Sequence, residues 1–370
     1  MDNSLTVIFR ADASLEIGTG HVMRCLTLAL GLLKKGASVS FLCREHDGNL
    51  IDLIRSHGFV VHALPLLPQG DYTEENPLDP AHAVWLGCNW QVDVEHCHAV
   101  LNDPVDWIIV DHYALDYRWE KAMRHKCHNM MCIDDLADRV HECDLLLDQN
   151  LGRTKGDYLE LVSTDTQLLL GPKFALLRSE FAEWRDTSIA SRKKPNLRHL
   201  LVAMGGVDSD NVTERVLKTV ARCKLADLER ITVVVGPTSP WFENIRIVAS
   251  SLDIPTSILS GIDNMAELMT SCDFAIGAAG ATTWERCNLG LPSVLIVLAN
   301  NQQSIARHMS HAKAAFVIDE IEKLEVSLST FLESPNLSQL MASYSQISSQ
   351  ILDAYGVNRV ISALRSTHER

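Results

Sequence analysis

The chain contains no run of apolar residues that approaches the roughly 20 needed to cross a membrane. Its first residues, Met1-Asp2-Asn3-Ser4, lack the basic segment with which a signal peptide begins. We therefore expect a cytoplasmic protein with no membrane partner. Its length of 370 residues suits two domains, each large enough to bury its own core.

The sequence also has no excess of basic residues. Lys and Arg number 33 against 47 Asp and Glu, which gives a formal net charge of −14 at pH 7. Nucleic-acid-binding proteins usually carry a basic patch, so this balance argues against a nucleic-acid partner. It is compatible with an anionic small substrate, because backbone amides and helix dipoles bind phosphate even in an acidic protein.

The ten cysteines include no C-x-x-C pair. Several lie in apolar segments, among them Cys25, Cys43, Cys132 and Cys272, so we expect reduced and partly buried thiols rather than a disulfide framework. The segment His96-Cys97-His98 carries metal-ligating side chains. It indicates a metal site only weakly, because neighbouring side chains alternate in direction and a second ligand pair is missing.

Short apolar runs alternate with helical stretches through the first half of the chain. This alternation predicts a parallel, doubly wound α/β sheet. The expected strands are Thr6–Arg10, Ser38–Cys43, Val60–His62, Trp107–Val110, Met130–Ile133 and Leu145–Leu147, and the expected helices include Val22–Leu33, Leu50–His57, Val92–Leu101 and Tyr117–His125. The intervening segment Leu64–Trp90 is rich in Pro, Gly and polar residues and is long for a loop, which favours a functional flap.

The alternation restarts after Ser188–Arg198, a basic segment broken by Pro that we expect to be a linker. The expected strands beyond it are Leu200–Met204, Ile231–Val235, Thr256–Leu259, Phe274–Ile276, Ser293–Leu298 and Ala315–Ile318, with helices at Val212–Ala221, Met265–Ser271, Thr283–Leu289, Gln303–Ser310 and Glu322–Leu332. We expect Rossmann-like domains over residues 1–187 and 199–345, followed by a helical segment over 346–370. Open α/β sheets bind ligands at the carboxyl ends of their strands, so two such domains are expected to face a cleft.

The most informative stretch follows the first expected strand. Gly18-Thr19-Gly20 makes a tight turn, and His21 opens a long apolar helix. Because the positive end of a helix disfavours an imidazolium, we expect His21 to be a neutral imidazole that can act as a general base. The alternative is that His21 only caps the helix or packs. The match to a dinucleotide-binding fingerprint is poor, since the third glycine is absent.

Two glycine-containing turns in the second half are candidate anion sites. Gly205-Gly206 follows an expected strand, although a plain turn with Asp208 or Ser209 as helix cap explains it equally well. In Gly277–Glu285 the small residues Ala279 and Gly280 precede a helix that begins near Thr282, whose amides suit a diphosphate. Glu285 would accept hydrogen bonds from a ribose diol. The alternative is that Thr282 and Glu285 form a capping box.

Polar residues also follow other expected strands. Asp111-His112-Tyr113 and Ile133-Asp134-Asp135 are expected to face the same cleft as His21. Together with Asp12, these acids could hold a metal, although hydrogen-bonded or solvated strand-end acids are the simpler account. Asn300-Asn301 follows another strand, and its amides suit sugar hydroxyls or amides.

Taken in order, these motifs resemble those of the UDP-sugar hydrolases of the pseudaminic acid pathway, the PseG family. The resemblance runs from about residue 5 to 312. The segments that carry it are Arg10–Ser14, Ile17–Leu26, Asp111–Tyr113, Ile133–Arg139, Asp148–Asn150, Gly171–Phe181, Met204–Gly206, Gly280–Glu285 and Leu289–Ser293.

This resemblance implies a GT-B fold similar to that of MurG-type glycosyltransferases. It implies hydrolysis of UDP-2,4-diacetamido-2,4,6-trideoxy-β-L-altropyranose to UDP and the free sugar, with inversion and without metal or cofactor, in pseudaminic acid biosynthesis and so in flagellin glycosylation. It further implies that His21 is the base, Tyr113 an active-site tyrosine, Glu285 a UDP ligand and Asn301 a sugar contact. The remaining expected substrate-binding residues are Gly18, Thr19, Gly20, Asp111, Gly205, Gly206, Ala279, Gly280 and Thr282. We favour a monomer.

UDP is a good leaving group, so one base that activates water can suffice for an inverting hydrolase. Three alternatives stay open: a GT-B glycosyltransferase that uses a nucleotide-sugar donor, a hydrolase of a related nucleotide sugar, and a non-catalytic nucleotide-sugar binder. In the hydrolase, the glycine turn before His21 would form the wall behind the sugar, while the turns of the second half would hold the diphosphate.

Overall fold

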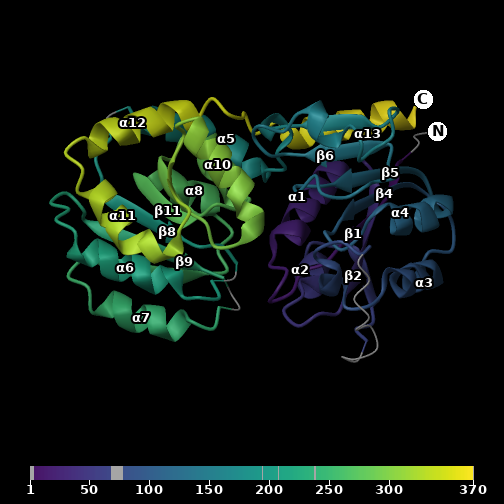
Figure 1. Ribbon diagram of the computed structural model, residues 1–370, viewed down its shortest axis with the longest axis horizontal. Helices are drawn as coiled ribbons and strands as arrows, with labels where there is room; N and C mark the ends of the chain where they lie inside the picture. The colour runs from purple at the N-terminus through teal and green to yellow at the C-terminus, as the bar shows by residue number, and fades with distance from the viewer. Residues whose placement is uncertain (1–3, 68–77, 194, 207, 237–238, 370) are drawn as a thin grey trace. The chain divides into compact units, whose positions relative to one another are not determined.

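A computed structural model describes residues 4–67, 78–193, 195–206, 208–236 and 239–369. The chain divides into two units. Unit 1 is Met1–Leu176 together with Tyr355–Arg370, and unit 2 is Leu177–Ala354. Each unit is built on a sheet flanked by helices (Figure 1).

Unit 1 contains a seven-stranded sheet in the order β3-β2-β1-β4-β5-β6-β7. Its neighbouring strands pair in parallel. The strands are β1 (Thr6–Ala11), β2 (Ser38–Arg44), β3 (Val60–Leu64), β4 (Val105–Asp111), β5 (Cys127–Ile133), β6 (Leu145–Asp148) and β7 (Gln167–Leu170). The α-helices are α1 (Gly20–Lys34), α2 (Ile51–Ser56), α3 (Trp90–Val100), α4 (Tyr117–Met123) and α13 (Gly356–His368), with the short 3-10 helices η1 (Ala83–Leu86), η2 (Arg124–Lys126), η3 (Lys155–Tyr158) and η4 (Pro172–Phe174).

Successive residues of the central strands enter different cores. In β1, Val7 and Phe9 pack in the cluster that contains apolar residues of α1 and α13, whereas Ile8 packs in the cluster that contains residues of α3 and α4. The same alternation places Ile109 of β4 in the first cluster and Ile108 in the second. Burial on both faces explains why these strands are continuous apolar runs rather than alternating ones.

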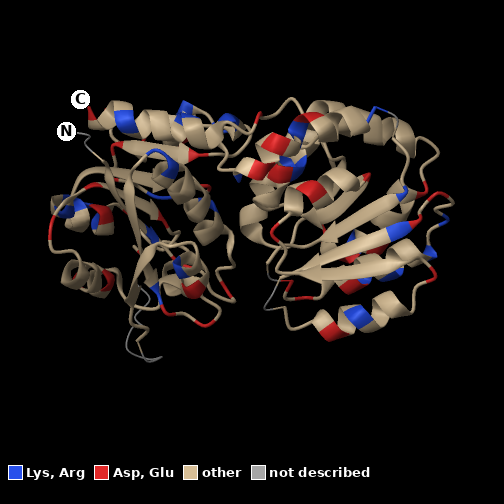
Figure 2. Ribbon diagram, turned by 180° about the vertical axis from the view of Figure 1, so that it is seen from behind, with Lys and Arg blue, Asp and Glu red and all other residues tan. Residues whose placement is uncertain are grey.

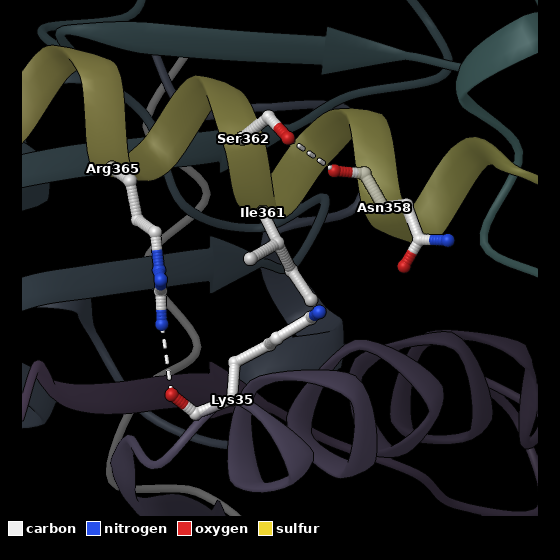
Figure 3. Close-up of a pocket in the computed structure, with 5 residues that line it drawn as sticks. All are labelled: Lys35, Asn358, Ile361, Ser362 and Arg365. Atoms are coloured by element: carbon white, nitrogen blue, oxygen red, sulfur yellow. Dashed lines mark hydrogen bonds between the residues drawn. The ribbon is translucent and has the colours of Figure 1, made fainter.

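The helix α13 returns to unit 1, where glycines allow it to pack closely on α1 and on the backbone at Ala175. A Cβ atom at Gly31 of α1 would lie 2.6 Å from Cγ1 of Val357, and one at Gly356 would lie 2.1 Å from the carbonyl oxygen of Ala175. At the far end of the contact, Arg365 Nη2 donates a hydrogen bond to the carbonyl of Lys35 over 2.8 Å (Figure 3). These contacts explain why the last helix belongs to the first unit.

A small pocket lies where α13 passes the end of α1. Figure 3 shows its lining residues, which are Lys35, Asn358, Ile361, Ser362 and Arg365. Its volume is about 220 Å³. Sites for small organic ligands occupy roughly 300 Å³ or more, so this gap is too small for a nucleotide sugar.

Unit 2 contains a six-stranded parallel sheet in the order β10-β9-β8-β11-β12-β13. Its strands are β8 (His199–Ala203), β9 (Arg230–Val235), β10 (Thr256–Ser260), β11 (Phe274–Ala278), β12 (Ser293–Ile296) and β13 (Phe316–Ile318). Its helices are α5 (Ser179–Ser191), α6 (Val212–Arg222), α7 (Phe242–Ser250), α8 (Met265–Ser271), α9 (Thr282–Asn288), η5 (Asn300–Gln302), α10 (Gln303–His311), η6 (Ile321–Lys323), α11 (Leu324–Leu332) and α12 (Leu337–Ser348).

The division of the chain differs from the one expected from composition. Residues 177–198, including the expected linker 188–198, group with unit 2, and residues 355–370 group with unit 1. The helix α5 continues into the expected linker as far as Ser191. Just beyond it, the buried Arg192 donates hydrogen bonds to the carbonyls of Met269, Cys272 and Leu289. These hydrogen bonds from the Arg192 guanidinium hold the segment 188–198 on unit 2.

The surface carries charges of both signs. Figure 2 shows Lys and Arg interspersed with Asp and Glu on the helices and loops of both units. Within the described ranges, none of the helices is both long enough and apolar enough to cross a membrane. All ten cysteines are free thiols.

Candidate functional site

His21 lies in the first turn of α1, directly after a tight turn. Gly18 has φ of +80°, a backbone conformation that favours glycine, and its amide donates to the carbonyl of Ser14 over 2.9 Å. His21 Nδ1 lies 2.6 Å from Oδ1 of Asp111, the last residue of β4. Because an ionised carboxylate only accepts hydrogen bonds, Nδ1 is the donor in this contact. In a neutral imidazole Nε2 would then be the acceptor, which is the tautomer that a general base needs.

Arg24 connects His21 to two carboxylates. It lies one turn further along α1, and its Nε and Nη2 atoms each donate to Asp111 over 2.6 Å, while Nη1 donates to Oδ2 of Asp135 over 2.5 Å. Burial raises the pKa of Asp111, but the charge of Arg24 and the hydrogen bonds from Arg24 and His21 outweigh it and hold that pKa well below its usual value. With a neutral His21, one guanidinium faces two carboxylates. Arg24 thus fixes Asp111 as the acceptor for His21 Nδ1.

Tyr113 packs against the imidazole from the loop after β4. The ring centroids of His21 and Tyr113 are 4.5 Å apart in an edge-to-face arrangement, and the Tyr113 hydroxyl donates to Asp135 over 2.8 Å. Burial, followed by the charge of Asp135, raises the pKa of Tyr113 well above its usual value. The hydroxyl is therefore a permanent donor.

The expected flap contributes two rings to the same place. Trp85 of η1 stacks on Tyr113 with 5.9 Å between ring centroids, and His82 lies 4.3 Å from Trp85 and 5.6 Å from Tyr113. Residues 68–77 of the expected flap Leu64–Trp90 lie outside the described residues. The part that is described therefore reaches the residues around His21.

The acids considered as metal ligands each have a cationic partner. Asp12 accepts from Arg10 over 2.7 Å, and Asp134 accepts from Arg139 over 2.9 Å, while Arg24 serves both Asp111 and Asp135. These contacts agree with the simpler account of hydrogen-bonded acids at strand ends.

A buried ion network surrounds Asp12. Asp93 of α3 accepts from Arg10 and Arg44, each over distances of 2.6–2.7 Å to its Oδ2 atom. His112 Nε2 lies 3.2 Å from Asp12. The segment around Cys97 also joins this network, since the Cys97 thiol donates to Asp93 over 3.5 Å, while His98 packs its ring on His125.

The first glycine turn of unit 2 follows β8. Gly205 has φ of +93°. A Cβ atom at Gly236, which follows β9, would lie 1.9 Å from the carbonyl oxygen of Gly206, so two strand-end loops touch through their backbones. Asp208 accepts hydrogen bonds from the amides of Val212 and Thr213, each over 2.8 Å. The N-cap residue of α6 is Asn211 and not Asp208 or Ser209, although the Asp208 carboxylate satisfies the first amides of that helix.

Glu285 does not cap its helix. The N-cap of α9 is Ala281, and no side chain makes a capping hydrogen bond there, so the capping box between Thr282 and Glu285 is not formed. Glu285 Oε1 instead lies 3.4 Å from Nη2 of Arg178, with the Glu285 side chain 16% exposed. Burial raises the pKa of Glu285, an effect that Arg178 opposes. The carboxylate is thus held by a side-chain partner and keeps acceptor capacity.

The loop before α9 and the loop after β12 carry the remaining candidate residues of unit 2. Ala279 is buried, and its amide donates to the carbonyl of Ile296 over 3.0 Å. A Cβ atom at Gly280 would lie 4.0 Å from the side-chain nitrogen Nε2 of Gln302. Among the described residues, Oδ1 of Asn301 is buried without a hydrogen-bond partner.

The predicted residues therefore fall into two groups. Gly18, Thr19, Gly20, His21, Asp111 and Tyr113 lie in unit 1, whereas Gly205, Gly206, Ala279, Gly280, Thr282, Glu285 and Asn301 lie in unit 2. Sequence reasoning missed Arg24, His82, Trp85 and Arg178. Only Arg24 carried a local signal, because residues three apart on a helix share a face and His21 precedes it by three.

Comparison with known proteins shows the fold and supports a class of enzyme. Residues 199–351 match the glycosyltransferase family 28 C-terminal domain. The chain is 25% identical to the UDP-2,4-diacetamido-2,4,6-trideoxy-β-L-altropyranose hydrolase of Campylobacter jejuni over 304 residues. The aligned region covers 82% of this chain and 95% of that protein. The chain is 26% identical over 289 residues to an uncharacterized protein of Methanocaldococcus jannaschii. That aligned region covers 77% of this chain and 54% of the archaeal protein.

The similarity to solved structures extends over both units. MurG of Acinetobacter baumannii matches with a TM-score of 0.65 at 16% identity, covering 98% of this chain and 99% of that chain. The protein has the GT-B fold. The predicted fold class is thus confirmed. The chain spans about half the length of the archaeal relative. Together the similarities support a nucleotide-sugar enzyme of the GT-B fold.

Proposed function

We propose that the protein is an inverting hydrolase of UDP-2,4-diacetamido-2,4,6-trideoxy-β-L-altropyranose that releases UDP and the free sugar. The observation that carries the proposal is the hydrogen bond of 2.6 Å between His21 Nδ1 and Asp111. It leaves Nε2 as the basic nitrogen at the start of a helix that follows a glycine turn. The similarity to the Campylobacter hydrolase supports the choice of substrate.

In the proposed reaction, a water oxygen attacks the anomeric carbon on the face opposite UDP. The water proton passes to Nε2 of His21, and the anomeric C–O bond breaks with its electron pair leaving on the UDP oxygen. The imidazolium that forms is stabilised by Asp111, which is already ionised beside Arg24. A base of this kind contributes roughly 10²–10⁴-fold to the rate. UDP leaves without a proton, so neither a general acid nor a metal is required.

The sugar in this proposal meets the unit 1 group. The amides of Gly18, Thr19 and Gly20 line the turn before His21, and the fixed Tyr113 hydroxyl and the adjoining Trp85 ring offer a polar and an apolar surface. An aromatic face suits the C–H side of a deoxysugar.

UDP in this proposal meets the unit 2 group. The backbone of Gly205-Gly206 and of residues 280–282, beside the buried Ala279, provides donors for the diphosphate, since the N-cap of α9 makes no side-chain capping bond. Glu285 would accept hydrogen bonds from the ribose hydroxyls. The unpartnered Oδ1 of Asn301 would accept a hydrogen bond from the N–H of an acetamido group of the sugar. The proposed pathway is pseudaminic acid biosynthesis, and we propose a monomer in the cytoplasm.

The test is hydrolysis in ¹⁸O-labelled water without any acceptor. We expect the purified protein to release UDP that stays unlabelled, because the C–O bond breaks, and proton NMR to show the α anomer of the sugar first. Label in the β-phosphate of UDP would mean attack at phosphorus and contradict the proposal. The β anomer appearing first would contradict inversion.

A second candidate is a glycosyltransferase, which the match of residues 199–351 to a glycosyltransferase domain favours. Such an enzyme would release UDP from the same donor only when a sugar or lipid acceptor is present. The acceptor-free assay separates the two functions, because a transferase would leave the nucleotide sugar almost intact. The same assay with a panel of UDP-sugars distinguishes a hydrolase of a related sugar, and tight UDP binding without turnover indicates a non-catalytic binder.

A further inference from the structure

The guanidinium of Arg24 is shared between two carboxylates beside His21. Its Nε and Nη2 atoms contact the two oxygens of Asp111, each over 2.6 Å, and Nη1 reaches Asp135 over 2.5 Å. The Nη2 atom also lies 3.4 Å from Nδ1 of His21. Because the Arg24 side chain is only 7% exposed, water and salt screen its charge little. A fixed positive charge therefore lies in contact with the proposed base.

We propose that Arg24 is a positioning residue that keeps His21 neutral and links it to Tyr113. Two opposite charges contact the imidazole. Asp111 accepts a hydrogen bond from Nδ1 and favours the imidazolium, whereas the like charge of Arg24 disfavours it. Because Arg24 offsets Asp111, the ring can donate through Nδ1 and still keep the Nε2 lone pair. This role rests on the proposed function, in which that lone pair accepts the proton of water.

The third donor of Arg24 extends the arrangement to Tyr113. Oδ2 of Asp135 accepts hydrogen bonds from Nη1 of Arg24 and from the Tyr113 hydroxyl, over 2.5 and 2.8 Å. Oδ1 of the same carboxylate accepts from Asn150 over 3.1 Å, which fixes its orientation. Tyr113 in turn packs edge-to-face on His21. Displacement of Arg24 would therefore disturb the base and the tyrosine together.

The other groups around His21 leave these charges in control. Three groups that titrate also face the imidazole, namely His82, His112 and Tyr113. Burial lowers the pKa of both histidines and raises the pKa of the tyrosine, so all three are uncharged near neutral pH. Asp111, Asp135 and Arg24 are therefore the charges that decide whether His21 holds a second proton.

A lysine could supply the charge of Arg24 but not its geometry. The guanidinium presents Nε, Nη1 and Nη2 in one plane, and here each of the three has a carboxylate oxygen as acceptor. An ammonium is a single point charge on a flexible stem and cannot hold two carboxylates in fixed positions. Arg24→Lys thus separates the effect of charge from the effect of position.

The test follows the His21 imidazole in the full-length protein without substrate. Protein with ¹⁵N-labelled histidines is titrated by NMR, and the His21 signals are those that disappear in His21→Gln. We expect the neutral wild-type ring to carry its proton on Nδ1. In Arg24→Met the midpoint of the His21 titration should rise by about one pH unit or more, because Asp111 is no longer offset. In Asp135→Asn, which removes a negative charge instead, the midpoint should fall.

Arg124→Met is the matched control. Arg124 makes a two-atom contact with Asp144 in the same unit, over 2.5 and 2.6 Å, and its loss should leave the His21 titration as in the wild type. Circular dichroism checks folding. A midpoint that stays unchanged in Arg24→Met, or a neutral wild-type ring protonated on Nε2, would overturn the proposal. If Arg24→Met does not fold, an unchanged midpoint in Asp135→Asn overturns it.

Kinetics test the positioning itself. In Arg24→Lys we expect a titration close to that of the wild type, but a kcat lower by roughly tenfold or more, since a small misplacement of a catalytic group is costly. The dissociation constant for UDP should not change. A wild-type kcat in Arg24→Lys would show that charge alone suffices. Wild-type protein that releases no UDP would instead refute the hydrolase, while the titrations still decide whether Arg24 keeps His21 neutral.

Discussion

At the scale of single residues, the two nitrogens of His21 have different tasks. Nδ1 is committed to Asp111 at 2.6 Å, and only Nε2 can accept a proton from water. We expect His21→Ala to lower kcat by roughly 10²–10⁴-fold while the dissociation constant for UDP stays unchanged, because the residues proposed to bind UDP lie in unit 2. Steady-state kinetics and calorimetry measure the two effects.

The control for this variant is His57→Ala, which removes an exposed imidazole whose described hydrogen bond is to the carbonyl of Leu53. It should leave kcat as in the wild type. Turnover by His21→Ala close to that of the wild type would mean that another group activates water.

Glu285 is the residue on which the proposed UDP site depends most. Its carboxylate lies 3.4 Å from Arg178 and makes no helix cap, so it is free to bind hydroxyls. Hydrogen bonds to a charged group contribute about 1.5–3 kcal/mol, so Glu285→Gln should weaken UDP binding roughly 10- to 100-fold. Glu267→Gln removes a first-turn glutamate of α8 and is the matched control. Equal affinities of the two variants in calorimetry would remove Glu285 from the site.

Asp93 gives a pH dependence with a defined sign. Its pKa falls from 3.8 to about 2, because Arg10 and Arg44 outweigh the effect of burial. A carboxyl group with a lowered pKa stabilises the fold above its unfolded pKa and loses that effect as the pH falls. This group should therefore remove about 2 kcal/mol from the free energy of unfolding between pH 4 and pH 2.

Urea denaturation of Asp93→Asn isolates this contribution. The variant leaves two buried guanidinium groups short of a partner, so it should cost about 3–5 kcal/mol at pH 7. The difference from the wild type should shrink as the pH falls through Asp93's titration range. A difference that is constant from pH 7 to pH 2 would show that Asp93 is not ionised in the fold.

At the scale of elements, the packing of α13 against the backbone at Phe174 and Ala175 depends on glycine. A Cβ atom at Gly356 would meet the backbone of Ala175 at 2.1 Å and that of Phe174 at 2.6 Å, and backbone cannot move aside as a side chain can. We expect Gly356→Ala to lower the free energy of unfolding by about 1–3 kcal/mol. In Gly156→Ala the added Cβ would meet its nearest atom at 3.4 Å, so this control should differ little from the wild type in thermal melting.

The elements were largely predictable from sequence because they are buried on two faces. Apolar runs such as those of β1 and β4 can only be interior strands between helices, and this pattern gave the parallel sheets. The edge strand β7 was missed. It has four residues and is buried at only one of them, so it lacks the signal.

The site was predictable where its residues are local and unpredictable where they act across the chain. The glycine turn, His21 and the small residues before α9 are contiguous motifs. Arg178 is 107 residues from Glu285, and Trp85 is 28 residues from Tyr113, so only the fold brings each pair together. The capping box was formally present in the sequence, yet Glu285 contacts Arg178 instead.

At the scale of the whole molecule, the net charge of −14 should govern how fast an anionic ligand arrives. Repulsion between the protein and UDP acts over distances that salt screens, with a Debye length of about 10 Å at 0.1 M. We expect the association rate constant for UDP, measured by stopped flow, to increase when KCl rises from about 10 mM to about 150 mM. A decrease would show that local positive charge, and not the net charge, controls the encounter.

The return of α13 to unit 1 has a consequence for the synthesis of the protein. A ribosome finishes all of unit 2 before it makes residues 355–370, so the unit that emerges first is the last to be completed. During that interval the face of α1 around Gly31 has no partner, and its apolar side chains are accessible to chaperones and proteases. Any truncation before Tyr355 would leave the nascent chain in that state, with the helix that carries His21 among the elements left uncovered.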